Sequence, residues 1–162
     1  MTWEQIATMA AAGQEMANHT YSHRDPDKQS LAEFKADILA GDSAIFAHTG
    51  IHPTALAYPF NHHNDAQTAI ATELSLIPRL SQQSFGGKRV STEADFEAWL
   101  TKTLKSGGWT VTMTHGISSG YDALPQPELF EKYIRRLAQL QSEGEILILP
   151  FSEAASYMQA RM

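Results

Sequence analysis

The order of apolar and polar positions predicts helices that alternate with short strands along the whole chain. The clearest helix is expected from Pro127 to Glu143, where apolar residues recur at helical spacing along one face. The other helices are expected at residues whose side chains can cap a helix start, with Gly41 expected to interrupt the second. These capping residues are Thr2, Ser30, Asn64, Thr92 and Ser152.

Five short apolar runs between these helices predict strands. Strands that alternate with helices are typical of a parallel α/β sheet. The polar stretch 81–91 is predicted to be the longest loop. The predicted strands lie near residues 14–19, 54–60, 75–80, 109–115 and 145–149.

Composition narrows the class of protein without identifying its chemistry. A length of 162 residues with 43% hydrophobic and 19% charged residues fits one globular domain. The net charge of −6 and the lack of a basic cluster argue against a nucleic-acid partner, and the lack of cysteine excludes a thiolate metal site. No apolar run approaches the roughly 18 residues of a membrane helix, and the first residues do not form a signal peptide. Localisation is left open.

The strongest chemical signal is the pair His19 and His23 at the end of the first predicted strand. We expect three intervening residues to place both imidazoles on one side of a helical turn, where they can bind one divalent cation, commonly zinc. Carboxyl ends of parallel strands carry the chemistry in α/β barrels. The pair therefore predicts a metal site.

A second pair with the same spacing, His48 and His52, serves as a comparison. Gly50 and Pro53 disfavour a helix there, and the segment leads to the amino end of a strand. We therefore predict no metal site at this pair.

Four segments together resemble one known family, the polysaccharide deacetylases with NodB homology, also described as carbohydrate esterase family 4. The stretch from Gly13 to His23 resembles the second motif of the family, and Ala57-Tyr58-Pro59-Phe60-Asn61 is similar to a variant of its third motif. The stretch from Gly108 to Ile117 resembles the strand that delivers a catalytic histidine, and residues 146–158 resemble the last strand and helix.

The resemblance implies an α/β fold, a parallel (β/α) barrel with about seven strands. Residues 1–162 are then expected to be a single NodB-like deacetylase domain that lacks its N-terminal part, since five strands are predicted. An oligomer would cover the open edge of such a barrel.

One family motif has no counterpart in this chain. The first motif ends in two adjacent aspartates, the catalytic base and the third metal ligand, whereas the seven aspartates here are all separate. In addition, Ala57 replaces an arginine that contacts the base in many members. Three explanations stay open: the first segment is missing from the chain, the protein is a catalytically dead relative that binds carbohydrate or acts as a scaffold, or another chain supplies the pair.

The resemblance implies hydrolysis of an acetyl group from a sugar, usually an N-acetyl amide, with an acetylated glycan as the partner. It implies a divalent metal, zinc with cobalt or nickel as alternatives, bound by His19 and His23. The backbone N–H of Phe60 would hold the oxyanion, and His115 would protonate the leaving amine. The predicted substrate-binding residues are Tyr58, Pro59, Asn61 and Arg79, and the alternative third ligands are His62 and His63.

Overall fold

The computed structural model describes residues 1–86, 89–117 and 127–161. The chain divides into two compact units. The first comprises Met1–Leu80 and Leu149–Met162, and the second comprises Ser81–Ile148. The sequence predicted a single domain over residues 1–162, which stays a prediction.

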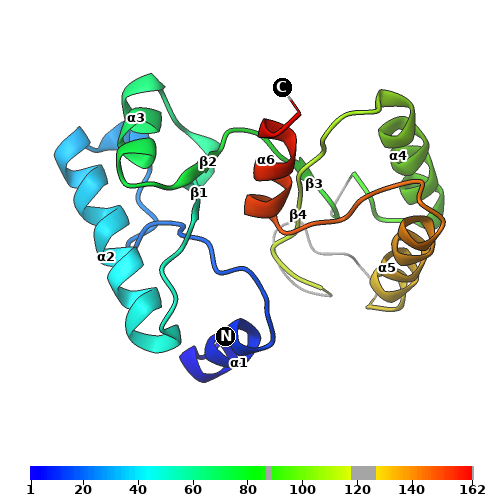
Figure 1. Cartoon of the computed structure of the whole chain (residues 1–162), viewed down its shortest axis with the longest axis horizontal. Coiled ribbons are helices and arrows are strands. Elements are labelled where there is room, and N and C mark those ends of the chain that lie inside the picture. The colour runs from blue at the N-terminus through cyan, green and yellow to red at the C-terminus, as the bar shows by residue number, and fades with distance from the viewer. Residues whose placement is uncertain (87–88, 118–126, 162) are drawn as a thin grey trace. The chain divides into compact units, whose positions relative to one another are not determined.

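The first unit contains a pair of parallel strands and four α-helices (Figure 1). The strands pair in register, with Ala55 opposite Ile77 and Ala57 opposite Arg79. The elements are α1 (Trp3–Ala11), the 3-10 helix η1 (Pro26–Lys28), α2 (Leu31–Thr49), β1 (Ala55–Ala57), the 3-10 helix η2 (Pro59–Asn61), α3 (Asp65–Glu73), β2 (Ile77–Arg79) and α6 (Phe151–Gln159).

Capping boxes start the first three α-helices where the sequence predicted them. Thr2, Ser30 and Asn64 each accept a hydrogen bond from the backbone N–H three residues later, and the side chain at that position bonds back. Contrary to the prediction, α2 continues through Gly41. This glycine lies against Asn18: a Cβ at its position would be 2.8 Å from the Asn18 Oδ1.

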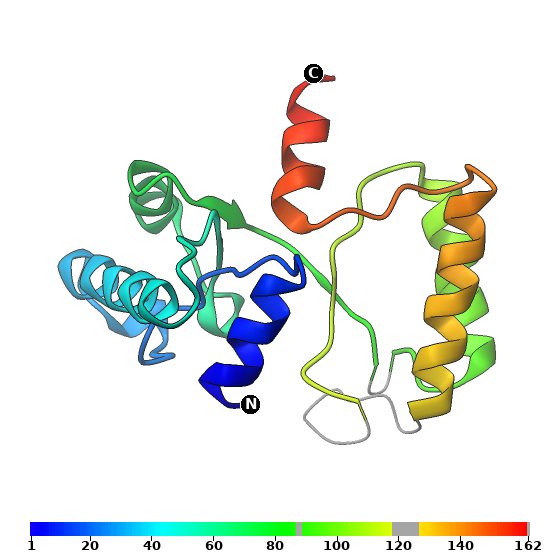
Figure 2. The same cartoon turned by 60° about the horizontal axis from the view of Figure 1, so that its bottom comes forward.

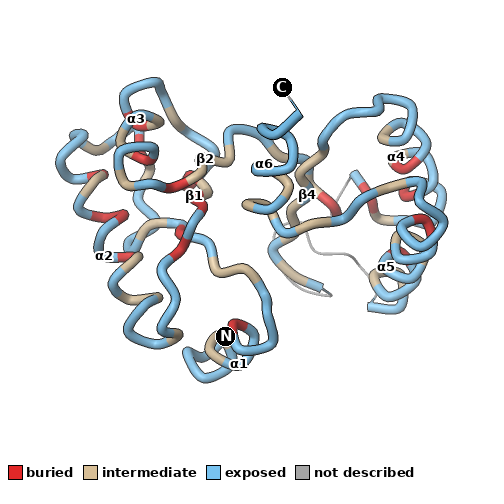
Figure 3. Tube along the Cα trace, viewed as in Figure 1, coloured by how far each residue is buried: buried red, intermediate tan, exposed pale blue. Residues whose placement is uncertain are grey.

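The core of the first unit lies between α2, α3 and the two strands. Buried positions occur on all three of α2, β1 and α3 (Figure 3). The core residues are Phe34, Ile38, Leu56, Tyr58, Ala71 and Leu76. This packing fixes β1, and therefore the segments that follow it, against the helix that begins after the histidine pair.

The predicted strand 14–19 pairs at one residue. Asn18 forms a parallel bridge with Leu56, donating its N–H to the Ala55 carbonyl at 2.8 Å and accepting from the Ala57 N–H at 2.9 Å. The prediction is therefore correct at the end that carries His19. Among the described residues, the stretch before Asn18 is not assigned to a strand.

The second unit has a smaller sheet and two α-helices packed side by side (Figures 1 and 2). Phe96 of α4 stacks on Tyr133 of α5 with ring centroids 4.2 Å apart. The elements are β3 (Gln83–Ser84), α4 (Glu93–Ser106), β4 (Thr112–Met113) and α5 (Pro127–Ser142). The core residues are Phe85, Val90, Phe96, Leu100, Tyr133 and Leu140.

The α/β class and the parallel pairing are confirmed, but the prediction of five strands in one sheet is not. Over the described residues the strands form two two-stranded sheets, β1–β2 and β3–β4. The strand β3 lies inside the predicted loop 81–91, of which residues 87 and 88 fall outside the described residues. A two-residue strand has no periodicity of its own and is defined by its partner.

The predicted strand 145–149 is not assigned as a strand, and the last helix begins earlier than expected. The Ile148 N–H donates to the Gln141 Oε1 at 2.7 Å, so a side chain rather than a neighbouring strand satisfies it. The helix α6 has Pro150 at its N-cap in place of the predicted Ser152. No helix in the described part of the chain has the length and apolar character that a membrane span requires.

Candidate metal and substrate site

The first unit brings the two predicted ligands, His19 and His23, together. Their ring centroids are 4.8 Å apart and the rings meet edge to face. The expected helical turn is wrong, because residues 19–23 are not helical and Thr20 and His23 have positive φ angles of 62° and 53°. Such angles are rare for residues other than glycine and require support from surrounding bonds. A bent loop, rather than a helix, thus aligns the rings.

Asn18 and α2 provide much of that support. The Asn18 side chain is fully buried; its Nδ2 donates to the Ile38 carbonyl at 2.9 Å and its Oδ1 accepts from the Thr20 N–H at 2.8 Å. One residue of α2, Asp37, accepts from both the N–H and the hydroxyl of Ser22, at 3.0 and 2.7 Å. The loop between the histidines is therefore held at both ends.

The chemistry of the pair fits a divalent metal. The Nδ1 of His19 lies 2.7 Å from the Ala57 carbonyl oxygen, and since a carbonyl only accepts, this nitrogen carries the proton. In a neutral imidazole the Nε2 then has the lone pair that a metal needs, and a carbonyl partner of this kind orients a ligating ring. Within the described residues, no carboxylate joins His19 and His23 in a group of three close ligands.

The turn after β1 places Phe60 beside this pair. Phe60 and Asn61 both have positive φ angles, 57° and 58°, within η2. The exposed Phe60 ring meets the His23 ring edge to face at 5.0 Å. The backbone that the resemblance implies as the oxyanion donor therefore belongs to a turn in direct contact with a predicted ligand.

Tyr58 and Pro59, predicted to bind substrate, are buried. The Tyr58 ring stacks on Phe34 at 6.1 Å and lies 4.9 Å from the His63 ring, while its hydroxyl donates to the Thr68 hydroxyl at 3.5 Å. Burial raises the pKa of Tyr58. Both residues anchor the start of the turn in the core.

Arg79 and Asn61, the other predicted substrate-binding residues, contact each other. The Arg79 Nη2 donates to the Asn61 Oδ1 at 3.1 Å, and Nη1 is buried without a hydrogen-bond partner. Burial lowers the pKa of Arg79. Because Arg79 is opposite Ala57 in the sheet, its backbone lies one strand away from the carbonyl that orients His19.

His115 belongs to the second unit and follows β4 by two residues. It is exposed, and its neighbour Thr114 accepts from the Gly116 N–H at 3.5 Å. Its position at the carboxyl end of a short parallel strand agrees with the sequence prediction. Its role as an acid stays a prediction.

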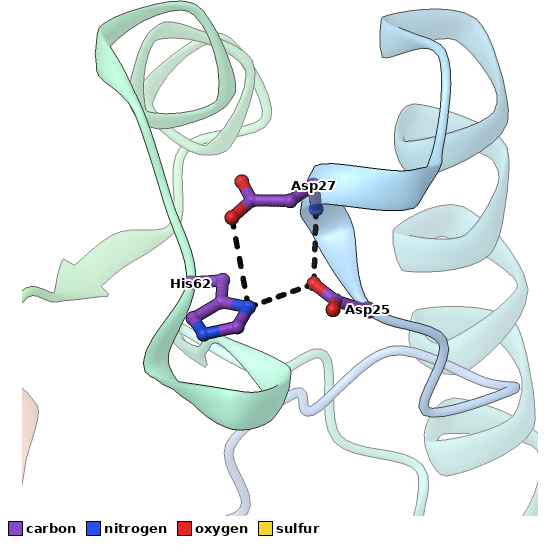
Figure 4. A group of neighbouring side chains, drawn as sticks. All are labelled: Asp25, Asp27 and His62. Carbon is purple, nitrogen blue, oxygen red and sulfur yellow. Dashed lines mark hydrogen bonds and ion pairs between the residues drawn. The ribbon is translucent and has the colours of Figure 1, made fainter.

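The structure also reveals a cluster that the sequence analysis missed. Asp25, Asp27 and His62 each offer a ligand atom, and these atoms all lie within 4.8 Å of one another (Figure 4). The His62 imidazole had been considered as an alternative ligand beside His19 and His23, but the aspartates had not. The signal that could have been used is the Asp25-Pro26-Asp27 sequence, in which the first residue caps η1.

The two rings of the comparison pair, His48 and His52, contact different side chains, and the absence of a metal site there stays a prediction. His48 stacks on Trp3 with centroids 4.3 Å apart, whereas His52 stacks on Phe46 at 4.1 Å and bonds Asp42 through Nδ1 at 2.9 Å. The two rings have separate partners.

The sequence profile of the family described as polysaccharide deacetylase matches residues 1–77, which contain the histidine turn, β1 and the Phe60 turn. This match covers just under half of the chain, and over it the sequence is similar to the polysaccharide deacetylases. The resemblance predicted from the motifs is thereby confirmed over the segment that carries His19 and His23.

Solved structures extend the likeness in fold to most of the polysaccharide deacetylase-like chain. A family 4 carbohydrate esterase from Streptomyces lividans gives a TM-score of 0.63 at 20% identity, covering 88% of this chain and 68% of that one. A peptidoglycan N-acetylglucosamine deacetylase gives a TM-score of 0.65 at 18% identity, covering 86% of this chain and 62% of that one. A family 4 pseudoenzyme from Bacillus anthracis gives a TM-score of 0.60 at 17% identity, covering 85% of this chain and 46% of that one. Identities this low show a shared fold alone.

A human curated protein, Divergent protein kinase domain 2B, is 24% identical over 133 residues. The match covers 74% of this chain and 30% of the human protein. The chain thus spans under a third of the length of that relative.

Proposed function

We propose that this chain belongs to a metal-dependent hydrolase that removes acetyl groups from a carbohydrate, with an N-acetyl sugar polymer or oligosaccharide as substrate. The reaction would cleave a carbon–nitrogen bond that is not a peptide bond. The observation that carries the proposal is the bent loop that brings the His19 and His23 rings to 4.8 Å beside the Phe60 turn. The family match over residues 1–77 supports the same reading.

The roles follow from the chemistry of the groups. A divalent cation on His19 and His23, zinc or alternatively cobalt or nickel, would supply a Lewis acid that activates water and polarises the acetyl carbonyl. The Phe60 N–H would donate to the oxyanion, a contribution that is typically large in acyl transfer. His115 would donate a proton to the leaving amine.

Two further residues are proposed to hold the sugar. Asn61 is exposed and already receives a hydrogen bond from Arg79, so the pair presents an ordered polar group beside the Phe60 turn. Tyr58 and Pro59 would act indirectly, since their burial fixes where that turn begins.

A second candidate is a catalytically inactive relative that binds carbohydrate or acts as a scaffold. The observation in its favour is that, over the described residues, no carboxylate stands close to both His19 and His23. Without such a carboxylate, the His19–His23 site has neither a general base for the attacking water nor a third ligand for the metal. The solved pseudoenzyme of similar fold makes this class a concrete alternative.

The first test is activity with and without a supplied carboxylate pair. The 162-residue chain, given zinc or cobalt, should show negligible hydrolysis of acetylated chito-oligosaccharides, because it has no adjacent pair of aspartates to serve as base and third ligand. A longer protein that adds a strand ending in Asp-Asp before residue 1 should be active. In it, His115→Ala should lower turnover by about 10²- to 10⁴-fold, the usual contribution of a general acid, while zinc affinity is retained.

The matched control is His52→Ala, which removes an exposed imidazole from the other pair and should change neither activity nor metal binding. His19→Ala should abolish activity and should abolish metal binding at the His19–His23 site. Robust activity of the unextended chain would contradict the missing-base argument, whereas an inactive extended chain that still binds acetylated sugar would favour the inactive relative.

A further inference from the structure

The cluster of Asp25, Asp27 and His62 joins two segments that are distant in sequence. In Figure 4 the two aspartates, from the start of η1, face the imidazole that follows η2. The His62 Nδ1 lies 2.9 Å from the Asp25 Oδ1 and 3.6 Å from the Asp27 Oδ2. One nitrogen and two carboxylate oxygens therefore converge on a common point.

Charge and the burial of one member distinguish this cluster from a simple surface ion pair. The Asp25 side chain is 14% exposed, whereas those of Asp27 and His62 are 56% and 48% exposed. Two carboxylates placed side by side repel each other, and a positive charge between them, either a protonated His62 or a metal ion bound to its neutral ring, relieves that repulsion. The nearby Lys28 Nζ is 3.6 Å from the Asp25 Oδ2, but its side chain is 81% exposed and it approaches only that carboxylate.

The backbone holds both segments in place independently of the three ligand atoms. The carbonyl of buried Pro26, between the two aspartates, accepts from the Gln67 Nε2 of α3 at 2.8 Å. On the other side, the His62 N–H donates to the Pro59 carbonyl at 3.2 Å. Ligands mounted on such fixed segments lose little freedom when they bind an ion.

We propose that Asp25, Asp27 and His62 bind a divalent transition-metal ion, zinc or manganese, at a second site separate from His19 and His23. Carboxylate oxygens with one imidazole nitrogen suit both ions, and two negative charges would balance the ion. The ion would tie η1 to the turn after β1. The Phe60 ring lies between the sites, 5.0 Å from His23 and 6.2 Å from His62, so the second ion would steady that turn.

The test removes His19 and His23, so that metal binding reports on the proposed second site. Metal-free protein with His19→Ala and His23→Ala is titrated calorimetrically with zinc and, separately, with manganese. One equivalent of at least one ion should bind with micromolar affinity. Adding Asp27→Asn, which preserves shape and removes one charge, should weaken binding by at least about tenfold, as should His62→Gln.

The matched control is His52→Gln in the same background. His52 also bonds an aspartate through Nδ1 at 2.9 Å, but a single carboxylate faces it, so binding should be unchanged. Manganese added to the same double variant offers a second readout: it should broaden the NMR signals of the His62 ring and leave those of the His52 ring sharp. Absence of saturable binding in the double variant, or binding that Asp27→Asn and His62→Gln leave unchanged, would overturn the proposal.

Discussion

At the scale of single residues, the geometry of the His19–His23 site depends on residues that are not themselves predicted to bind the metal. Asn18 is buried and supports Thr20, which adopts a backbone angle that is rare for a branched residue. Gly41 leaves the space that Asn18 occupies, since a Cβ there would also lie 3.1 Å from the Thr20 carbonyl carbon. The alignment of His19 is thus decided by a contact between a helix and a loop.

The residue-scale prediction is that Gly41→Ala destabilises the protein by about 1–3 kcal/mol, the usual cost of overpacking, and weakens zinc binding at His19 and His23. Helix propensity alone would make this change favourable by about 1 kcal/mol, so a net loss identifies the clash. Urea unfolding and zinc calorimetry measure the two effects.

The control is Ala40→Gly, at the exposed neighbouring position of α2. It should cost about 1 kcal/mol through helix propensity without changing zinc affinity. Equal zinc affinity in the Gly41→Ala variant and the unsubstituted chain would show that Asn18 does not transmit the clash to the histidines.

At the scale of elements, capping boxes connect helix stability to pH. The carboxylate of Asp95 accepts hydrogen bonds from Thr92 and Ser91 at the start of α4. These bonds lower the pKa of Asp95, the bond from the Thr92 hydroxyl most and the bond from the Ser91 backbone N–H next. In α2 the hydroxyl of Ser30 likewise lowers the pKa of Glu33. Carboxylates with a lowered folded pKa stabilise the fold above their unfolded pKa, and that stability is lost as pH falls through the folded value.

We therefore expect the melting temperature to fall as the pH drops below about 4, near the unfolded pKa of aspartate. Asp95→Asn should lower the melting temperature at neutral pH and make its decline with acid less steep. Circular dichroism melts between neutral and strongly acidic pH measure both. A variant whose decline is as steep as that of the unsubstituted chain would contradict the assignment to this cap.

At the scale of the whole molecule, two units have separate cores, and both predicted metal ligands belong to the first unit. Phe34 lies in the first core with Tyr58, next to the segments that carry His19 and His23, whereas Phe96 lies in the second. Packing in one core should therefore affect metal binding more than packing in the other.

We predict that Phe34→Ala and Phe96→Ala each cost about 3–5 kcal/mol, the usual loss for a buried phenylalanine, but differ in their effect on zinc. Phe34→Ala should weaken zinc binding at His19 and His23, and Phe96→Ala should leave it unchanged. Calorimetry at a temperature where both variants stay folded by circular dichroism compares them. Equal loss of affinity would show that the two cores act as one.

The sequence alone determined the features that are encoded within a few neighbouring residues. Four of the five predicted capping residues are correct because a capping side chain and its backbone partner are three residues apart. The candidate ligands came from a local motif. Short apolar runs predicted strands at 14–19 and 54–60, which contain the observed bridge at Asn18 and the strand Ala55–Ala57.

Tertiary structure decided everything that depends on distant partners. The rings of His19 and His23 meet through a loop that α2 shapes, rather than through a helical turn, because Asn18 and Asp37 bond its backbone. The stretch 145–149 does not form the predicted strand because a strand needs a hydrogen-bonded neighbour, which an apolar run in the sequence cannot supply. The Asp25–His62 contact spans 37 residues of sequence, and only the packing of η1 beside the β1 turn brings those groups together.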